Sequence, residues 1–200
     1  FGHRLARAIR TRNVIWYPYG DFNPPPGEGS QRVLRSIEGI RTADPGALFA
    51  AELAPPDDLP AANPDANAVL SVNSFYGNGP DHNGAVYETA GAAWDDRTRD
   101  GAPRPAWVCE PPYEGTTVGG PGTADAVRTT QWYSVLGGGT AGQTFGTLDI
   151  YCFHPERWRE SLSTPAAREL AIQFAYYDSV AWHRLVPSGT GRYGVEIVTG

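Results

Sequence analysis

Short apolar runs alternate with helix-like patterns along most of this chain. Runs rich in β-branched, aromatic or small apolar residues predict strands at residues 13–17, 47–53, 68–75, 106–109 and 142–150. Apolar residues at helical spacing predict helices around residues 33–40, 86–93, 123–136 and 164–177, and residues 5–10 resemble the end of an earlier helix. Because no hairpin signals join the strands, the alternation predicts an α/β fold with about five parallel strands.

The strand at residues 106–109 ends on an acid. Glu110 follows the apolar run directly, and Pro111 and Pro112 come next. Proline has no N–H to donate to a sheet ladder and its φ angle is fixed, so the chain must leave the sheet after Glu110. We therefore expect Glu110 at a rigid rim, although a solvated acid that merely closes a strand is the simpler alternative.

Polar residues also gather at the ends of earlier strands. Asp21 and Asn23 follow the strand at residues 13–17, where an Asx turn is the alternative reading, and Asn73 and Tyr76 lie at the exit of the strand at residues 68–75. Open doubly wound sheets and (β/α)₈ barrels both place functional groups there. A closed barrel is favoured because it brings the ends of distant strands over one mouth. A complete barrel has eight strands, so we expect this chain to lack three preceding βα units.

Composition narrows the possible partners. The 200 residues carry a formal net charge of −6. This net negative charge argues against nucleic-acid and anionic-membrane partners, which attract basic surfaces. The basic residues of the chain are all arginines, so lysine Schiff-base chemistry is excluded. The sequence shows no signal peptide and no apolar run long enough to span a membrane. It has no Cys/His spacing typical of a metal site, and we expect no cofactor. Cys109 and Cys152 are interpreted as buried thiols, with a disulfide as the alternative.

Several motifs occur together in a specific order. They are residues 13–16 running into Gly20-Asp21, residues 73–77, residues 110–115, residues 131–142, Phe145-Gly146, Phe153 with Trp158 and Leu162, and residues 182–187. With these motifs the chain resembles the apiosidase-like catalytic domain family, whose members are (β/α)₈ glycoside hydrolases that act on complex polysaccharides. The resemblance covers nearly the whole chain. It implies that residues 1–188 are a partial barrel holding strands four to eight, and that residues 189–200, with a possible strand at 195–198, are a tail or the start of a following β domain.

The resemblance also implies an activity. It places the acid/base carboxylate on Asp21 and the nucleophile on Glu110, favours a retaining mechanism in an extracellular or periplasmic enzyme, and leads us to expect that the isolated piece is inactive. The residues expected to contact the sugar are Tyr19, Asn23, Asn73, Tyr76, Tyr113 and Glu114. Two positions depart from the family pattern. Tyr19 stands where a glycine is common, and residues 52–54 replace a region that often carries a histidine, which leaves the details of sugar recognition open.

Two other functions compete with glycoside hydrolysis. A sugar-binding or structural relative without turnover would keep the barrel, but retention of both acids argues against it. A dinucleotide-binding domain is suggested only by Gly189-x-Gly191-x-x-Gly194. That fingerprint needs a strand before it and a helix after it, and the sequence predicts neither.

Overall fold

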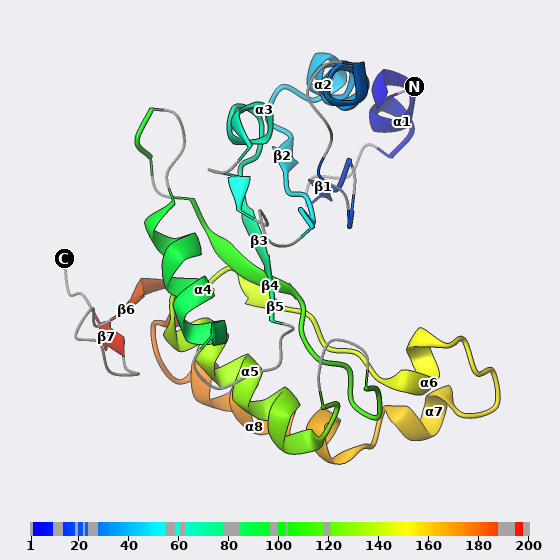
Figure 1. The fold of residues 1–200 in the computed structure, drawn as a ribbon, viewed down its shortest axis with the longest axis vertical. Coiled ribbons are helices and arrows are strands. Elements are labelled where there is room, and N and C mark those ends of the chain that lie inside the picture. Colours follow the sequence, from blue (N-terminus) through cyan, green and yellow to red (C-terminus); the bar gives the residue numbers. More distant parts are fainter. Residues whose placement is uncertain are drawn as a thin grey trace. The chain divides into compact units, whose positions relative to one another are not determined.

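The computed structural model describes residues 2–9, 14–18, 20–21, 23, 28–54, 59–60, 63–77, 85–96, 100–102, 104–117, 121–187 and 195–197. The chain divides into two compact units (Figure 1). Unit 1 comprises Phe1–Ser74 and Asp95–Pro105, and unit 2 comprises Phe75–Trp94 and Ala106–Gly200.

Unit 1 is built from a pair of parallel strands and the helices around them. Strands β1 (Ile15–Trp16) and β2 (Leu48–Phe49) pair in parallel, with Trp16 opposite Phe49. The helices are α1 (Gly2–Ile9), α2 (Glu28–Ala43) and α3 (Pro64–Asn67). This unit contains a cluster of buried apolar residues: Ala6, Trp16, Ile37, Ile40, Phe49, Ala51, Leu53, Ala66 and Leu70.

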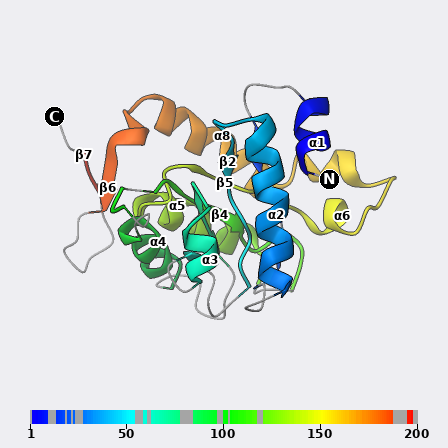
Figure 2. The same cartoon turned by 90° about the horizontal axis from the view of Figure 1, so that it is seen from above.

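Unit 2 continues the alternation of strands and helices. Strand β3 (Asn73–Tyr76) carries the chain into this unit, and β4 (Ala106–Glu110) pairs in parallel with β5 (Gly142–Gln143). Two longer helices, α5 (Ala124–Leu136) and α8 (Pro165–Asp178), pack against each other (Figures 1 and 2). The remaining elements are α4 (Ala85–Asp95), α6 (Leu148–Tyr151), α7 (Trp158–Ser161), the 3₁₀ helix η2 (Trp182–Arg184), β6 (Leu185–Pro187) and β7 (Val195–Ile197).

Local signals position the helix ends as predicted. The Thr123 side chain accepts a hydrogen bond from the Ala126 N–H at the start of α5, so Thr123 is its N-cap. Gly137 is the C-cap of the same helix. Pro165 occupies the first position of α8. An N–H at this position has no partner within the helix, so proline loses no hydrogen bond there.

Several predicted strands are shorter in the structure than in the prediction. Only Gly142 and Gln143 of the run 142–150 form a strand, because the backbone turns into α6, where the Tyr151 N–H bonds to the Thr147 carbonyl. In the run 68–75, the strand starts only at Asn73, because the turns that follow α3 include residues 68 and 69. Of the run 47–53, only Leu48 and Phe49 form a strand. Residues 185–187, for which no strand was predicted, form β6, which pairs antiparallel with β7.

The cysteines differ in their environments. Both are thiols, and Cys109 is buried as predicted, with its Sγ–H directed at the Phe75 carbonyl at 3.2 Å. Cys152 is exposed, so the prediction that it is buried was wrong. The reason is that the apolar run containing Cys152 does not continue β5 into the core but caps the short surface helix α6.

A buried arginine organises the polar interior of unit 1. Arg104 is 2% exposed, and its Nη1 donates to the Asp96 carboxylate at 2.7 Å and to Asn73 Oδ1 at 3.3 Å. Its Nη2 donates to the backbone carbonyl and the side-chain oxygen of Asn67, at 3.2 and 3.1 Å. The guanidinium fork thus connects the end of α3, the start of β3 and the segment after α4. A buried charge is tolerated only when such partners replace its water.

Removing this guanidinium should destabilise the fold strongly. Arg104→Leu leaves the Asp96 carboxylate buried without its counter-charge, for which we expect a loss of about 3–5 kcal/mol in the free energy of unfolding. Chemical denaturation of the purified protein measures this loss. Arg35→Leu on the exposed face of α2 is the matched control and should change stability by less than about 0.5 kcal/mol. Equal stability of the two variants would contradict the role of Arg104.

Candidate active site

Glu110 is the last residue of β4, as predicted, and its side chain is half-buried. The Gly77 N–H donates to its carbonyl oxygen at 3.0 Å, which ties Glu110 to the end of β3. Pro111 and Pro112 are fully buried directly behind it. A Cβ at Gly77 would lie 2.7 Å from Thr130 Cγ2, so only glycine permits this close approach. The acid therefore stands on a backbone fixed from both sides.

The segment after Glu110 extends the parallel pairing beyond the strands. The Glu114 N–H donates to the Gly146 carbonyl at 3.0 Å, and the Leu148 N–H donates to the Glu114 carbonyl at 2.8 Å. Glu114 and Thr147 thereby form a parallel bridge. Because β4 and β5 are parallel, the loops that follow them leave the sheet at the same edge, and these bonds hold the loops together.

The side chain of Glu114 contacts the start of α8. Its Oε1 accepts from the Ala166 N–H at 3.3 Å. The N-cap residue Thr164 makes no side-chain capping bond, so the carboxylate of Glu114 takes over this role. The structure thus uses Glu114, a predicted sugar ligand, to hold a helix in place.

The ring of Tyr113 is held between two neighbours. A Cβ at Gly146 would lie only 2.5 Å from Tyr113 Cδ1, so the ring packs directly on the glycine backbone. The Tyr151 ring lies 5.5 Å away, centroid to centroid, at an angle of 47°. Both contacts come from the loop after β5, and they join this loop to the Glu110 segment a second time.

In unit 1, Asp21 follows β1 and is exposed to solvent. Its φ angle is +53°, in the left-handed region that aspartate tolerates better than most residues. A left-handed backbone is strained at a non-glycine residue, and such strain is found often at functional sites. Tyr19, the predicted neighbour of this acid, lies outside the described residues.

Asn23 connects the loops after β1 and β2. Its Nδ2 donates to the Ala54 carbonyl at 2.7 Å, and its Oδ1 accepts from the Ala54 N–H at 3.0 Å. Close by, a Cβ at Gly20 would lie 3.0 Å from Glu52 Oε2. Glu52 is thus a second acid beside the Asp21 turn, and it was not among the predicted site residues. Glu52 lies three residues after the end of β2, but the sequence alone does not show that it approaches the Asp21 turn.

Two predicted ligands belong to β3. Asn73 is fully buried, begins the strand, and binds Arg104, whereas it was expected at the strand's end. Tyr76 ends the strand and is also buried. Of the predicted residues, Asp21, Asn23 and Asn73 belong to unit 1, and Tyr76, Glu110, Tyr113 and Glu114 belong to unit 2.

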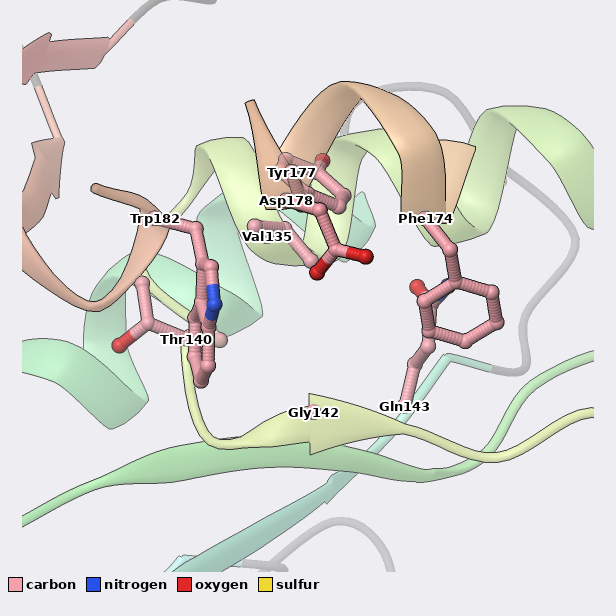
Figure 3. A pocket seen from close by; sticks show the side chains of 9 residues that line it. Val135, Thr140, Gly142, Gln143, Phe174, Tyr177, Asp178 and Trp182 are labelled. Carbon is pink, nitrogen blue, oxygen red and sulfur yellow. The ribbon is translucent and has the colours of Figure 1, made fainter. Parts of the chain in front are cut away.

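Unit 2 also contains a pocket of about 270 Å³ that none of the predicted residues lines (Figure 3). Trp182 and Phe174 stand on opposite sides of it, and β5 runs along its floor. Burial raises the pKa of Tyr177 in its wall to about 12, so this phenol is neutral at physiological pH.

Two observations concern other kinds of site. Within the described ranges, no three His, Cys, Asp or Glu side chains gather as metal ligands do. None of the helices in the described part of the chain is long and apolar enough to span a membrane.

The sequence matches the family described as "Apiosidase-like, catalytic domain" over residues 1–184. The chain belongs to this family. Two solved structures are similar to this apiosidase-like domain. One, named "Glycoside hydrolase", has a TM-score of 0.69 at 16% identity, with 97% of this chain and 51% of that chain covered. The other, a glycoside hydrolase family 5 protein from Bacteroides vulgatus ATCC 8482, has a TM-score of 0.57 at 21% identity, with 74% and 34% covered.

These likenesses establish the fold. The apiosidase-like domain has the parallel strands and alternating helices of part of a (β/α)₈ glycoside hydrolase, as predicted. The chain spans about half the length of the first of these structures, 51%. No curated protein matches the sequence.

The close contact between Tyr113 and Gly146 can be tested by adding one methyl group. Gly146→Ala places a Cβ inside the Tyr113 ring, so we expect a loss of about 1–3 kcal/mol in unfolding free energy and a changed near-ultraviolet circular dichroism signal. The control is Gly91→Ala in α4, where the nearest atom is 3.9 Å from the new Cβ. That change should stabilise the helix by about 0.5–1 kcal/mol. If Gly146→Ala is also neutral or stabilising, the packing is not as described.

Proposed function

We propose that the protein is a retaining glycoside hydrolase in which Glu110 is the nucleophile and Asp21 is the general acid/base. The observation that carries the proposal is the position of Glu110, held at the carboxyl end of β4 by the Gly77 bond and two buried prolines in a chain of the apiosidase-like family. (β/α)₈ enzymes place their catalytic groups at such strand ends. Asp21 follows another strand, β1, in the strained backbone region.

The proposed reaction has two steps. The Glu110 carboxylate attacks the anomeric carbon while the glycosidic bond breaks, and Asp21 donates its proton to the leaving oxygen. A water molecule then gives a proton to Asp21 and attacks the same carbon, which releases the sugar and regenerates the Glu110 carboxylate. Atoms and charge balance without a cofactor.

The proposed substrate is a complex polysaccharide, and the family resemblance favours an extracellular or periplasmic enzyme. In this proposal Tyr76 and Tyr113 border the nucleophile, since one ends β3 and the other follows Glu110 by three residues. Glu114, Asn23 and Asn73 contribute chiefly by holding loops and strands in position, because their polar atoms bind Ala166, Ala54 and Arg104. Tyr19 remains a proposed sugar contact next to Asp21.

The nucleophile is tested by Glu110→Gln in the natural protein. The amide has the same shape but cannot attack the anomeric carbon, so turnover should fall by about 10³-fold or more while the melting temperature is kept. Hydrolysis of a panel of 4-nitrophenyl glycosides and of soluble polysaccharides measures this. Glu88→Gln on the exposed face of α4 is the control and should leave turnover unchanged. An unaffected Glu110→Gln variant, or a parent that only binds sugar, would favour a non-catalytic relative.

The acid role of Asp21 predicts a dependence on the leaving group. Asp21→Asn should slow hydrolysis of natural glycosidic bonds by about 10²–10⁴-fold, because their leaving oxygen needs a proton. Bond cleavage in 4-nitrophenyl glycosides should be affected much less, since 4-nitrophenolate leaves unaided. The ratio of the two rates is the measurement, with Asp95→Asn at the end of α4 as control. Equal losses on both substrate types would exclude Asp21 as the proton donor.

A further inference from the structure

The loop after β5 presents several large apolar side chains to solvent. We call residues 144–164, which carry α6 and α7, the post-β5 loop. It extends beyond the end of β5, and Figure 2 shows it projecting away from α5 and α8. Its exposed apolar residues are Ile150, Tyr151, Phe153, Trp158 and Leu162. Exposed apolar groups concentrated in this way mark interaction sites more often than scattered ones do.

Phe153 is the extreme member of this group. It is 90% exposed, and its φ angle is +55°. The His154 N–H bonds to the Asp149 carbonyl and the Phe153 N–H to the Ile150 carbonyl, which is the Schellman pattern at the end of α6. Phe153 stands at the left-handed position of this motif, which is usually glycine because a bulky side chain is strained there. The chain thus keeps a phenylalanine where folding alone favours glycine.

The other two exposed aromatic rings of the loop, Tyr151 and Trp158, are partly covered. Tyr151 lies against the Tyr113 ring, and the guanidinium of Arg159 stacks over the Trp158 ring at 4.4 Å. Within the described residues, the Phe153 ring meets neither an aromatic ring nor a guanidinium. With 90% of its surface exposed, the Phe153 side chain is available to a ligand.

The loop that carries this ring is held in place. The Asp149 carboxylate binds His154 Nδ1 at 3.0 Å, Arg157 Nη1 at 3.3 Å and the Ser161 hydroxyl at 3.3 Å. The hydrogen bond with His154, then the charge of Arg157, lowers the pKa of Asp149 against the opposing effect of burial, so the carboxylate is ionised at neutral pH. The base of the loop is bonded to the Glu110 segment through Glu114 and Tyr113.

We propose that Phe153, flanked by Tyr151, is a stacking platform for a sugar ring of the polysaccharide substrate, outside the residue whose bond is cleaved. The inference rests on the proposed function, because it takes its ligand from there. An aromatic face packs against the apolar C–H face of a sugar ring, and the hydroxyls at the ring's edge remain free to bind water or nearby charged groups. Glu156, Arg157 and Glu160 are exposed on the same loop and suit those hydroxyls.

A lipid surface fits these residues less well. The post-β5 loop carries Asp149, Glu156 and Glu160 against Arg157 and Arg159, so it lacks the basic excess that attracts an anionic membrane. Continuity with the Glu110 segment instead places the ring on the loop that shares its sheet edge with the proposed nucleophile.

The test separates binding from turnover. In the natural protein carrying Glu110→Gln, affinity gel electrophoresis with soluble pectin, arabinogalactan and xylan measures dissociation constants without hydrolysis. Adding Phe153→Gly should raise by about tenfold the dissociation constant for whichever polysaccharide slows the parent protein in the gel. The melting temperature should rise by about 2–4 °C, because glycine relieves the left-handed strain. Phe153→Asn, which also tolerates this backbone, should behave alike, and Phe153→Tyr should keep the affinity.

Phe174→Ala is the matched control, since it removes an exposed aromatic ring from α8 and should leave polysaccharide binding unchanged. A lower melting temperature for both Phe153→Gly and Phe153→Asn would mean that the ring packs on protein, and it would overturn the platform. Unchanged affinity, or a parent that none of the three polysaccharides retards, would do the same. Because binding is measured without turnover, failure of the Glu110 assignment would show in the hydrolysis assay and not here.

Discussion

Parallel strand pairing is the constraint on which this architecture depends. When two strands run in parallel, the loops that follow them must leave the sheet at one edge, even though the loops are far apart in sequence. In unit 1, the loops after β1 and β2 are joined by the two bonds between Asn23 and Ala54. In unit 2, the loops after β4 and β5 are joined by the bridge between Glu114 and Thr147. Each pair of loops carries an acid at or near the end of a strand. Parallel pairing therefore brings two loops together beside each acid, as a site requires.

Close approaches of the backbone make the Glu110 rim rigid. Gly77 and Gly146 stand where a methyl group would collide with Thr130 or Tyr113, and Pro111 and Pro112 are buried behind the acid. Glycine loses more backbone conformational entropy on folding than any other residue, which lowers stability. Its use at both contacts indicates that close packing around the end of β4 stabilises the fold by more than this entropy costs. A nucleophile benefits from such a setting, since small displacements of reacting groups reduce rates severely.

Polar side chains that look like ligands in the sequence serve mainly as structural connections. Asn23 joins two loops, Asn73 binds the buried guanidinium of Arg104, and Glu114 caps α8. The bonds of Asn23 and Glu114 hold the segments that contain Asp21 and Glu110, and the bond of Asn73 holds the start of β3. A group of exposed apolar side chains lies on the post-β5 loop, where Phe153 keeps a strained backbone and is 90% exposed. In our proposals these polar residues position the chain, whereas aromatic residues contact the sugar.

The sequence by itself determined the features that depend on neighbouring residues. The end of β4 at Glu110 follows from two prolines, the start of α5 follows from Thr123, and the alternation of apolar patterns predicts the α/β class together with the family. Only the tertiary structure decided the features that depend on contacts between distant segments. The run 142–150 becomes a short strand and a helix because its backbone pairs with Glu114, and Cys152 is exposed as a consequence. Glu52 approaches the Asp21 turn, and β6 finds β7, through pairings that no local pattern encodes. Local propensity fixes where an element ends, whereas a side chain's partner is selected by the whole fold.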